Sequence, residues 1–137
     1  MMAPPMPAIT ALYAALVALL LVVLALRISR FRIRLGVGIG DGGDSALSRA
    51  IRVHANAVEW ALPVLLLMLV AELNRATPLL LHACGVALVM GRVLHGIGLG
   101  RRSGPSPGRF AGIMITWIVL LVLAAWDLWA FLRTLAV

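Results

Sequence analysis

Four long apolar stretches dominate the chain, and short segments rich in arginine, glycine and proline separate them. Three of the stretches cover residues 6–26, 78–99 and 110–132, and the fourth enters the apolar region near residue 55 and leaves it by residue 74. A helix of this length crosses a hydrocarbon core of ~30 Å. No alternation typical of strands competes with them. We therefore predict four transmembrane helices.

Helix boundaries follow from capping residues and charges. Proline fits the first turn of a helix, so Pro7 marks the start of the first one, and Arg27 is expected to end it. Asp44 or Ser45 is placed to cap the second helix. Residues 1–7 carry no positive charge ahead of the apolar stretch, which argues against a cleaved signal peptide. We expect the first helix to be retained.

The composition agrees with a chain that lies mostly in lipid. Hydrophobic residues make up 63% of the 137 residues and charged residues 12%. A soluble protein with this balance lacks the polar side chains to cover its surface. The four stretches leave no room for a separate soluble domain. The predicted fold is all-α, an integral membrane four-helix bundle forming one domain over residues 1–137.

Arginines predict the orientation in the membrane. Nine of the 12 lie on one side of the predicted bilayer and two on the other, and by the positive-inside rule the richer side is cytoplasmic and both termini are not. The nine are Arg27, Arg30, Arg32, Arg34, Arg49, Arg52, Arg101, Arg102 and Arg109; the two are Arg75 and Arg133, and Arg92 lies inside the third stretch.

Several other chemistries are disfavoured by the pattern. The net charge of +7 comes from arginines that flank apolar stretches, which indicates topology signals and contacts with acidic lipid headgroups instead of nucleic acid. Cys84 is the single cysteine, and no histidine pair has the spacing of a zinc site, so we expect no metal. The glycine-rich loop 36–44 follows no strand and is interpreted as a flexible turn. Small residues at Ala87, Gly91 and Gly98 predict close approach of another helix, within the bundle or in an oligomer.

A stripe of polar side chains marks the start of the second helix. Arg52, Asn56 and Glu59 fall within an arc of about 60° on one helix face, with Arg49 close to the same line. An unpaired carboxylate inside a bilayer costs about 2.5–3.5 kcal/mol, so Glu59 needs a partner. That partner is either an arginine of the bundle or of another subunit, or a bound ligand. A stripe with both signs of charge suits a zwitterionic small molecule.

The third helix repeats this pattern at the same level of the membrane. Arg92 and His95 are three residues apart on one face, near its cytoplasmic end. His95 is able to bond a ligand, a carboxylate or a backbone carbonyl. These two residues extend the candidate site from the second helix to the third.

Taken together, these motifs resemble the MAPEG family of membrane-associated proteins in eicosanoid and glutathione metabolism, and its bacterial inner-membrane branch in particular. The resemblance covers nearly the whole chain. It rests on Arg49-x-x-Arg52-x-x-x-Asn56-x-x-Glu59-Trp60-x-x-Pro63, on Gly91-Arg92-x-x-His95, on Arg109-Phe110-x-Gly112, and on Gly40-Asp-Gly-Gly-Asp44 leading into Arg52-Val-His-Ala-Asn56.

This resemblance implies a homotrimer in the bacterial inner membrane that binds glutathione as a co-substrate at the cytoplasmic side, between neighbouring subunits. A lipophilic small molecule from the bilayer would be the second substrate. The implied glutathione-binding residues are Arg30, Arg52, Asn56, Glu59, Trp60, Arg92 and His95, and Arg109 is the implied catalytic residue that faces the thiol.

The chain departs from the family pattern in two respects. Glutathione-using members place tyrosines where this chain has Trp60, His95 and Leu99. Arg101 and Arg102 compete with Arg109 for the position that faces the thiol. A glutathione transferase or peroxidase is therefore the leading hypothesis, a scaffold that binds lipid or glutathione without catalysis is the second, and a small transporter is the third.

Overall fold

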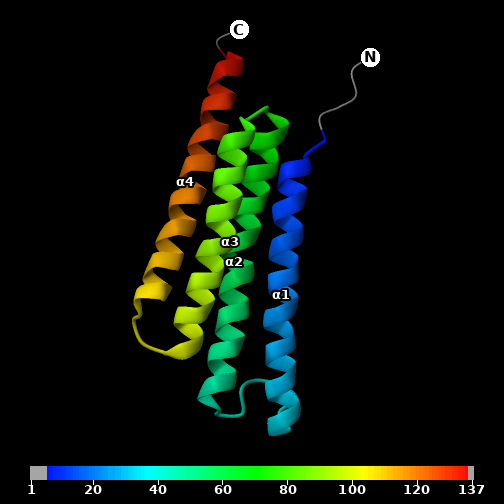
Figure 1. Cartoon of the computed structure of the whole chain (residues 1–137), viewed down its shortest axis with the longest axis vertical. Helices are drawn as coiled ribbons and strands as arrows, with labels where there is room; N and C mark the ends of the chain where they lie inside the picture. Colours follow the sequence, from blue (N-terminus) through cyan, green and yellow to red (C-terminus); the bar gives the residue numbers. More distant parts are fainter. Residues whose placement is uncertain (1–5, 136–137) are drawn as a thin grey trace.

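The computed structural model describes residues 6–135 and has the four predicted helices. They are α1 (Ala8–Leu35), α2 (Ser45–Leu73), α3 (Pro78–Arg101) and α4 (Pro107–Leu135), and each is long and apolar enough to cross a membrane. The α1–α2 and α3–α4 loops lie at one end of the bundle, and the start of α1 and the end of α4 lie at the other (Figure 1). Because nine arginines gather at the loop end, it is called the Arg-rich end below.

Helix α1 is longer than its apolar stretch predicts. Arg27 ends the apolar residues but not the helix, which continues to Leu35. Arginine is a good helix former, and no glycine or proline interrupts the segment before Gly36. Gly36 adopts a left-handed conformation with φ 67° and ends the helix there. The expectation that Arg27 ends the helix was therefore wrong, and a basic turn extends beyond the apolar part.

The other boundaries lie close to the predicted ones. The Asp44 carboxylate accepts hydrogen bonds from the amides of Ala46 and Leu47 at 2.9 and 2.7 Å, which confirms the predicted cap of α2. Helix α4 begins at Pro107, a turn before the apolar stretch. Residues 1–5, which the signal-peptide argument includes, lie outside the described part of the chain.

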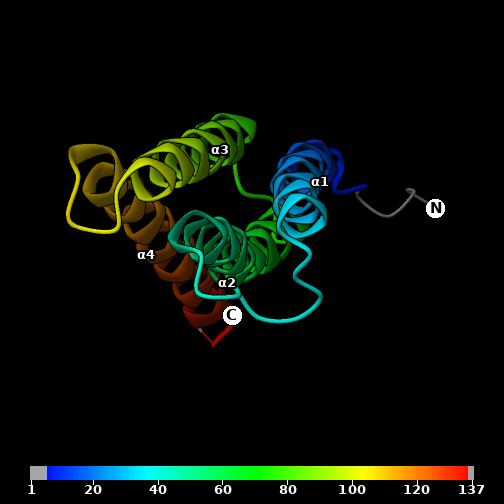
Figure 2. The same cartoon turned by 90° about the horizontal axis from the view of Figure 1, so that it is seen from below.

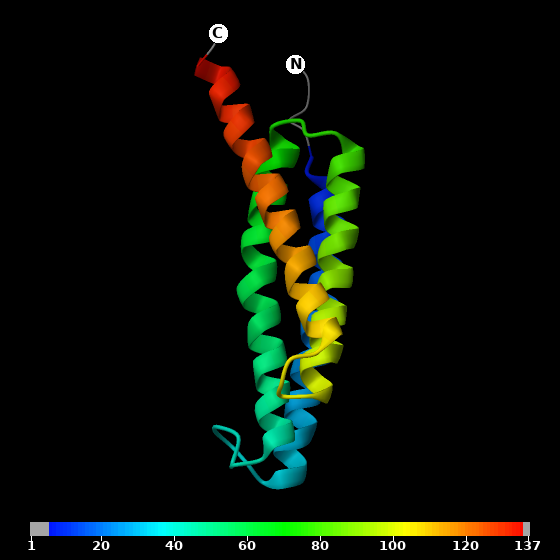
Figure 3. The same cartoon turned by 90° about the vertical axis from the view of Figure 1, so that its left-hand side faces the viewer.

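The helices are not packed symmetrically. Helices α3 and α4 share the most extensive contact, and α1 and α4 lie on opposite sides of the α2–α3 pair, where no contact joins them among residues 6–135 (Figure 2). Helix α4 slants across its neighbours, so its end rises away from the bundle (Figure 3). Helix α1 is therefore held by α2 and α3 alone.

Glycines set the short distance between α3 and α4. A Cβ atom added at Gly112 would lie 2.5 Å from the carbonyl oxygen of Gly91, and one added at Gly98 would lie 2.3 Å from the backbone nitrogen of Arg109. Side chains at these positions would force the helices apart. The stripe of small residues predicted on the third helix thus serves α4 of the same subunit.

A buried guanidinium joins three of the helices. Arg92 on α3 is 2% exposed and donates to Asn56 Oδ1 on α2 at 3.1 Å. It also donates to the Gly112 carbonyl at 3.0 Å and to the Thr116 hydroxyl, both on α4. Lipid offers no acceptors, so a guanidinium at this depth must find them within the protein. These bonds hold α2 and α4 at a fixed distance from α3.

Polar contacts at the opposite end attach α1. The Glu72 carboxylate, at the end of α2, accepts the backbone amides of Ile9 and Thr10 at 2.9 and 2.7 Å, which satisfies the first turn of α1. Tyr13 on α1 forms a 3.0 Å hydrogen bond with His82 on α3. One carboxylate and one phenol therefore fix where α1 begins.

Replacing Thr116 with valine tests the buried guanidinium. The substitution keeps the side-chain shape but removes one acceptor from Arg92, and we expect it to lower the free energy of unfolding by about 1.5–3 kcal/mol. In an Arg92→Met background the same substitution removes no hydrogen bond to a charged group, so it should lower the free energy of unfolding by distinctly less. Denaturant unfolding of the four proteins in detergent micelles gives the coupling free energy.

Thr134→Val supplies the matched control, because this hydroxyl is exposed and, among residues 6–135, bonds only the Phe131 carbonyl of its own helix. We expect it to leave the free energy of unfolding nearly unchanged. An equal loss for Thr116→Val with and without Arg92 would show that the guanidinium does not hold the helices together.

Candidate functional site

A cavity of about 470 Å³ opens at the Arg-rich end, between α2, α3 and the start of α4. Its walls combine three arginines with small polar groups, and aspartates lie at its rim. Pockets for small ligands have volumes of ~300–1,000 Å³, so this one suits a small peptide or nucleotide. Its lining residues are Asp41, Gly43, Asp44, Ser45, Ser48, Arg49, Arg52, Asn56, His95, Leu99, Ser103 and Arg109.

Cations from two helices meet in the cavity. Arg49 on α2 donates to the Ser103 hydroxyl at 3.4 Å, and Arg109 on α4 donates to the Ser103 carbonyl at 3.3 Å. Arg52 lies one turn along α2 and is exposed to the cavity. Ser103 thus draws together guanidiniums that repel one another. A bound anion would relieve this repulsion and accept their remaining N–H groups.

The aspartates at the rim are already engaged in local hydrogen bonds. Asp44 caps α2, as described above. The Gly43 amide donates to Asp41 at 3.0 Å and, together with the Ser48 hydroxyl, lowers the pKa of the Asp41 carboxyl. Asp41 is therefore ionised at neutral pH. The cavity is cationic inside and has a negative group at its mouth.

Asn56 presents a defined polarity to the cavity. Its Oδ1 accepts the hydrogen bond from Arg92, so the amide nitrogen is the group left for a ligand. The amide nitrogen of Asn56 can then donate to a ligand carbonyl or carboxylate, while Arg92 takes up one lone pair of the oxygen. Arg92, which is buried outside the cavity, thus orients the Asn56 amide and favours ligand atoms that accept a hydrogen bond.

The inner wall comes from α3. His95 and Leu99 lie one helical turn apart, line the cavity, and are 5% and 9% exposed. The His95 backbone packs directly on Gly112 of α4, where a Cβ atom would lie 2.5 Å from the His95 nitrogen. The close α3–α4 contact thus positions the imidazole. It offers a ligand one polar group beside an apolar surface.

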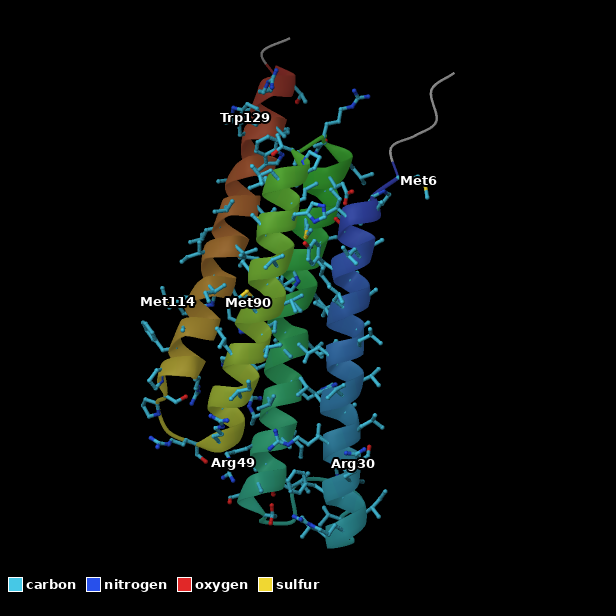
Figure 4. The ribbon with its side chains drawn as sticks, in the orientation of Figure 1. Met6, Arg30, Arg49, Met90, Met114 and Trp129 are labelled. Carbon is cyan, nitrogen blue, oxygen red and sulfur yellow. The ribbon has the colours of Figure 1, made fainter. Side chains whose placement is uncertain are left out.

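Four of the predicted residues do not line this cavity within one subunit. Arg92 is buried behind it, and Trp60 packs on Trp117 of α4, with ring centroids 5.8 Å apart. Glu59 is exposed on the outer face of α2. Arg30 lines a separate hollow on α1 with Arg27, Phe31 and Arg34; Figure 4 labels Arg30 and Arg49 at the same end of the bundle, on α1 and α2.

The cavity therefore brings together Arg52, Asn56, His95 and Arg109 of the predicted set. It contains Arg109 and neither Arg101 nor Arg102, which line another hollow.

Sequence reasoning missed the serines and the rim aspartate. Ser48 precedes Arg52 by four residues on the same face of α2, and this spacing was a usable signal. Ser103 lies in a loop, and only the fold brings it to Arg49. Asp41 was interpreted as part of a flexible turn, yet it lines the mouth of the cavity.

Comparison with known proteins identifies the family of this chain. The model of the MAPEG family matches residues 10–129. The inner membrane protein YecN of Escherichia coli strain K12 is 40% identical over 121 residues, which are 88% of this chain and 91% of YecN. YecN of Escherichia coli O6:H1 strain CFT073 matches over the same lengths with the same identity. A multi-pass membrane protein matched over nearly its whole length by this family, with a relative this similar, belongs to the MAPEG family.

Proposed function

We propose that this protein is a glutathione-dependent transferase or peroxidase of the inner membrane that acts on lipophilic electrophiles. The cavity at the Arg-rich end is the observation that supports the proposal, because it brings Arg49, Arg52 and Arg109 together. The carboxylates in its lining belong to the α1–α2 loop and the cap of α2, and none comes from the helices that form its inner wall. By the positive-inside rule this end faces the cytoplasm, where glutathione is abundant. The relatives named above are inner membrane proteins.

The chemistry of the cavity matches glutathione group by group. Glutathione has two carboxylates, and guanidiniums bind carboxylates through paired hydrogen bonds. Its peptide carbonyls suit the amide nitrogen that Asn56 presents. Its ammonium group needs an acid, for which Asp41 at the rim and Glu59 of a neighbouring subunit are the candidates. The apolar side chain of Leu99 would lie against the aliphatic part of the peptide.

Arg109 would activate the thiol. A thiol with a pKa of ~8.5 is only a few per cent ionised at neutral pH, and lowering its pKa by two units stabilises the thiolate by about 2.7 kcal/mol. The sulfur then forms a bond to the electrophilic carbon, the leaving group departs with its electron pair, and the thiol proton passes to water at the cavity mouth. Positioning and charge stabilisation supply the catalysis, without a covalent enzyme intermediate.

The site is proposed to be shared between subunits of a homotrimer. Arg52 and Glu59 lie on an exposed face of α2 that continues into Leu62 and Leu66, which are also exposed. Charged side chains are costly against lipid, so a second copy covering this face would shield them. The same packing would bring Arg30 of the neighbour toward the cavity.

A scaffold that binds its ligand without catalysis is the second candidate. It is favoured by the missing hydroxyl groups: Trp60 packs on Trp117, and Leu99 gives the cavity an apolar wall. Such a protein would hold glutathione or a lipid without ionising a thiol. The ultraviolet absorbance of the bound thiol separates the two candidates.

Adding glutathione to the purified protein at neutral pH should produce the ultraviolet absorbance of a thiolate. Arg109→Gln should abolish this signal while glutathione still binds, as measured by calorimetry, because the other arginines hold the carboxylates. Arg102→Gln is the matched control, since Arg102 lies in the same loop region but outside the cavity, and should keep the signal. Binding without thiolate in the natural protein would favour the scaffold. Absence of glutathione binding would contradict the transferase or peroxidase and leave only a scaffold that holds a lipid.

Asn56→Asp tests the polarity of the amide. The new carboxylate keeps the acceptor for Arg92, so the unfolding midpoint should not fall. It replaces the amide donor with a negative charge, and glutathione binding should weaken at least about tenfold, or 1.4 kcal/mol. Calorimetry and thermal unfolding measure the two effects separately. Unchanged affinity would mean that Asn56 does not contact the ligand.

Mixed oligomers test whether the site is shared. Arg30→Ala and Arg52→Ala subunits should each be unable to bind glutathione alone. If Arg30 and Arg52 of one site come from different subunits, each mixed trimer regains one of its three sites, about a third of the sites in the doubly tagged protein. Calorimetry of co-expressed, doubly tagged protein counts them. If each site lies within one subunit, no site is restored.

A further inference from the structure

A second hollow lies where α3 turns into α4, and the proposed glutathione site does not use it. Its volume is about 540 Å³, and it opens on the outer surface of the subunit. Apolar residues and glycines form most of its wall, and two arginines stand at its edge. The lining residues are Leu94, Ile97, Gly98, Arg101, Arg102, Ser106, Pro107 and Gly108.

The hollow is separate from the cavity described above. Leu94, Gly98 and Arg101 are four and three residues apart and share one face of α3. His95 and Leu99, which line the cavity, lie about 100° and 140° around the helix from Leu94. Between the two faces, Gly98 is in direct contact with the start of α4, where a Cβ atom would lie 2.3 Å from the Arg109 nitrogen. A ligand in one site does not reach the other.

The apolar wall faces the surroundings of the subunit. Leu94 is 37% exposed and Ile97 47% exposed, on a helix long and apolar enough to cross a membrane. Exposed aliphatic side chains at this level contact acyl chains. An occupant therefore needs an apolar part that lies along α3.

The arginines define the other end of the occupant. Arg101 is in the last turn of α3 and Arg102 follows it, and both are exposed. No carboxylate lines the hollow among the described residues. Ser106 and Gly108, at the start of α4, add a hydroxyl and a backbone amide on the positive side of the helix dipole. These groups complement a phosphate.

We propose that this hollow binds an acidic phospholipid, with its phosphate at Arg101 and Arg102 and an acyl chain along Leu94 and Ile97. A free phosphate would leave the apolar wall uncovered. A zwitterionic lipid places an ammonium group beside two guanidiniums, which opposes binding. The lipid would brace the α3–α4 turn from outside, and this inference does not depend on the identity of the ligand in the cavity.

Native mass spectrometry of the full-length protein in micelles containing equal phosphatidylglycerol and phosphatidylcholine tests the proposal. The natural protein should retain one phosphatidylglycerol per chain at this site. Arg101→Gln with Arg102→Gln should reduce its retention at least about tenfold, because each arginine contributes to headgroup attraction. Arg32→Gln with Arg34→Gln removes the same charge at the same end of the bundle, on α1, and should retain that lipid.

Two further arms identify the occupant. Ile97→Trp fills the apolar part while keeping both arginines, and it should also expel the lipid; added inorganic phosphate should displace none from the natural protein. Displacement by phosphate would identify a phosphate site and overturn the proposal. The proposal would also be overturned if the α1 control lost as much lipid as the Arg101 and Arg102 variant, or if that variant retained as much lipid as the natural protein. An intersubunit disulfide formed through Ile97→Cys would overturn it as well, because it would mean that a second copy fills the hollow. Glutathione binding, measured in parallel, should be unchanged in all of these variants.

Discussion

A guanidinium inside a membrane protein must be given its hydrogen-bond partners by the protein, because lipid supplies none. Arg92 meets this requirement at its two terminal nitrogens, with an amide on α2 and a carbonyl and hydroxyl on α4, while its Nε has no partner among the described residues. The distances between these helices are thereby restricted to those at which all three acceptors reach one side chain. The glycines at the α3–α4 contact make that spacing possible, since a side chain at Gly112 would push the acceptors away. The cavity lies beside this buried guanidinium, and the helix spacing that Arg92 fixes sets the distance between the cavity walls.

This constraint also sets the chemistry of the cavity. Arg92 binds the oxygen of Asn56 and leaves the amide nitrogen as a donor toward the cavity, so the cavity can offer guanidinium and amide N–H groups to an anion. The close contact of Gly98 with α4 places the Arg109 backbone against α3, and the loop before it turns so that Ser103 meets both Arg49 and Arg109. Arg101 and Arg102 are left on the other face. One helix therefore separates a cationic cavity from a largely apolar hollow on the outer surface of the subunit.

Helix α1 is attached to the rest of the bundle less extensively than any of the other three helices is. Within residues 6–135 it makes no contact with α4, and it is attached by Glu72 and Tyr13 at the end opposite the cavity. Its basic extension past Arg27 lies beyond the apolar stretch, and Arg30 points to a hollow of its own. The outer face of α2 also bears unshielded charges. Both features are expected of a subunit whose site is completed by a neighbour, and the mixed-oligomer experiment addresses them directly.

The number and type of helices were determined by the sequence alone, because spanning a hydrocarbon core requires a length and an apolarity that can be counted. The cap at Asp44 and the polar face with Arg52 and Asn56 were equally local, since helical spacing fixes them. The end of α1 was predicted wrongly, because hydropathy records where lipid ends and not where backbone hydrogen bonding ends. Only the tertiary structure decided that Arg92 joins three helices and that Trp60 packs on α4. It also decided that Arg109, and neither Arg101 nor Arg102, lines the cavity. Those roles depend on which side chains from distant segments meet, and the spacing within one helix carries no information about its partners.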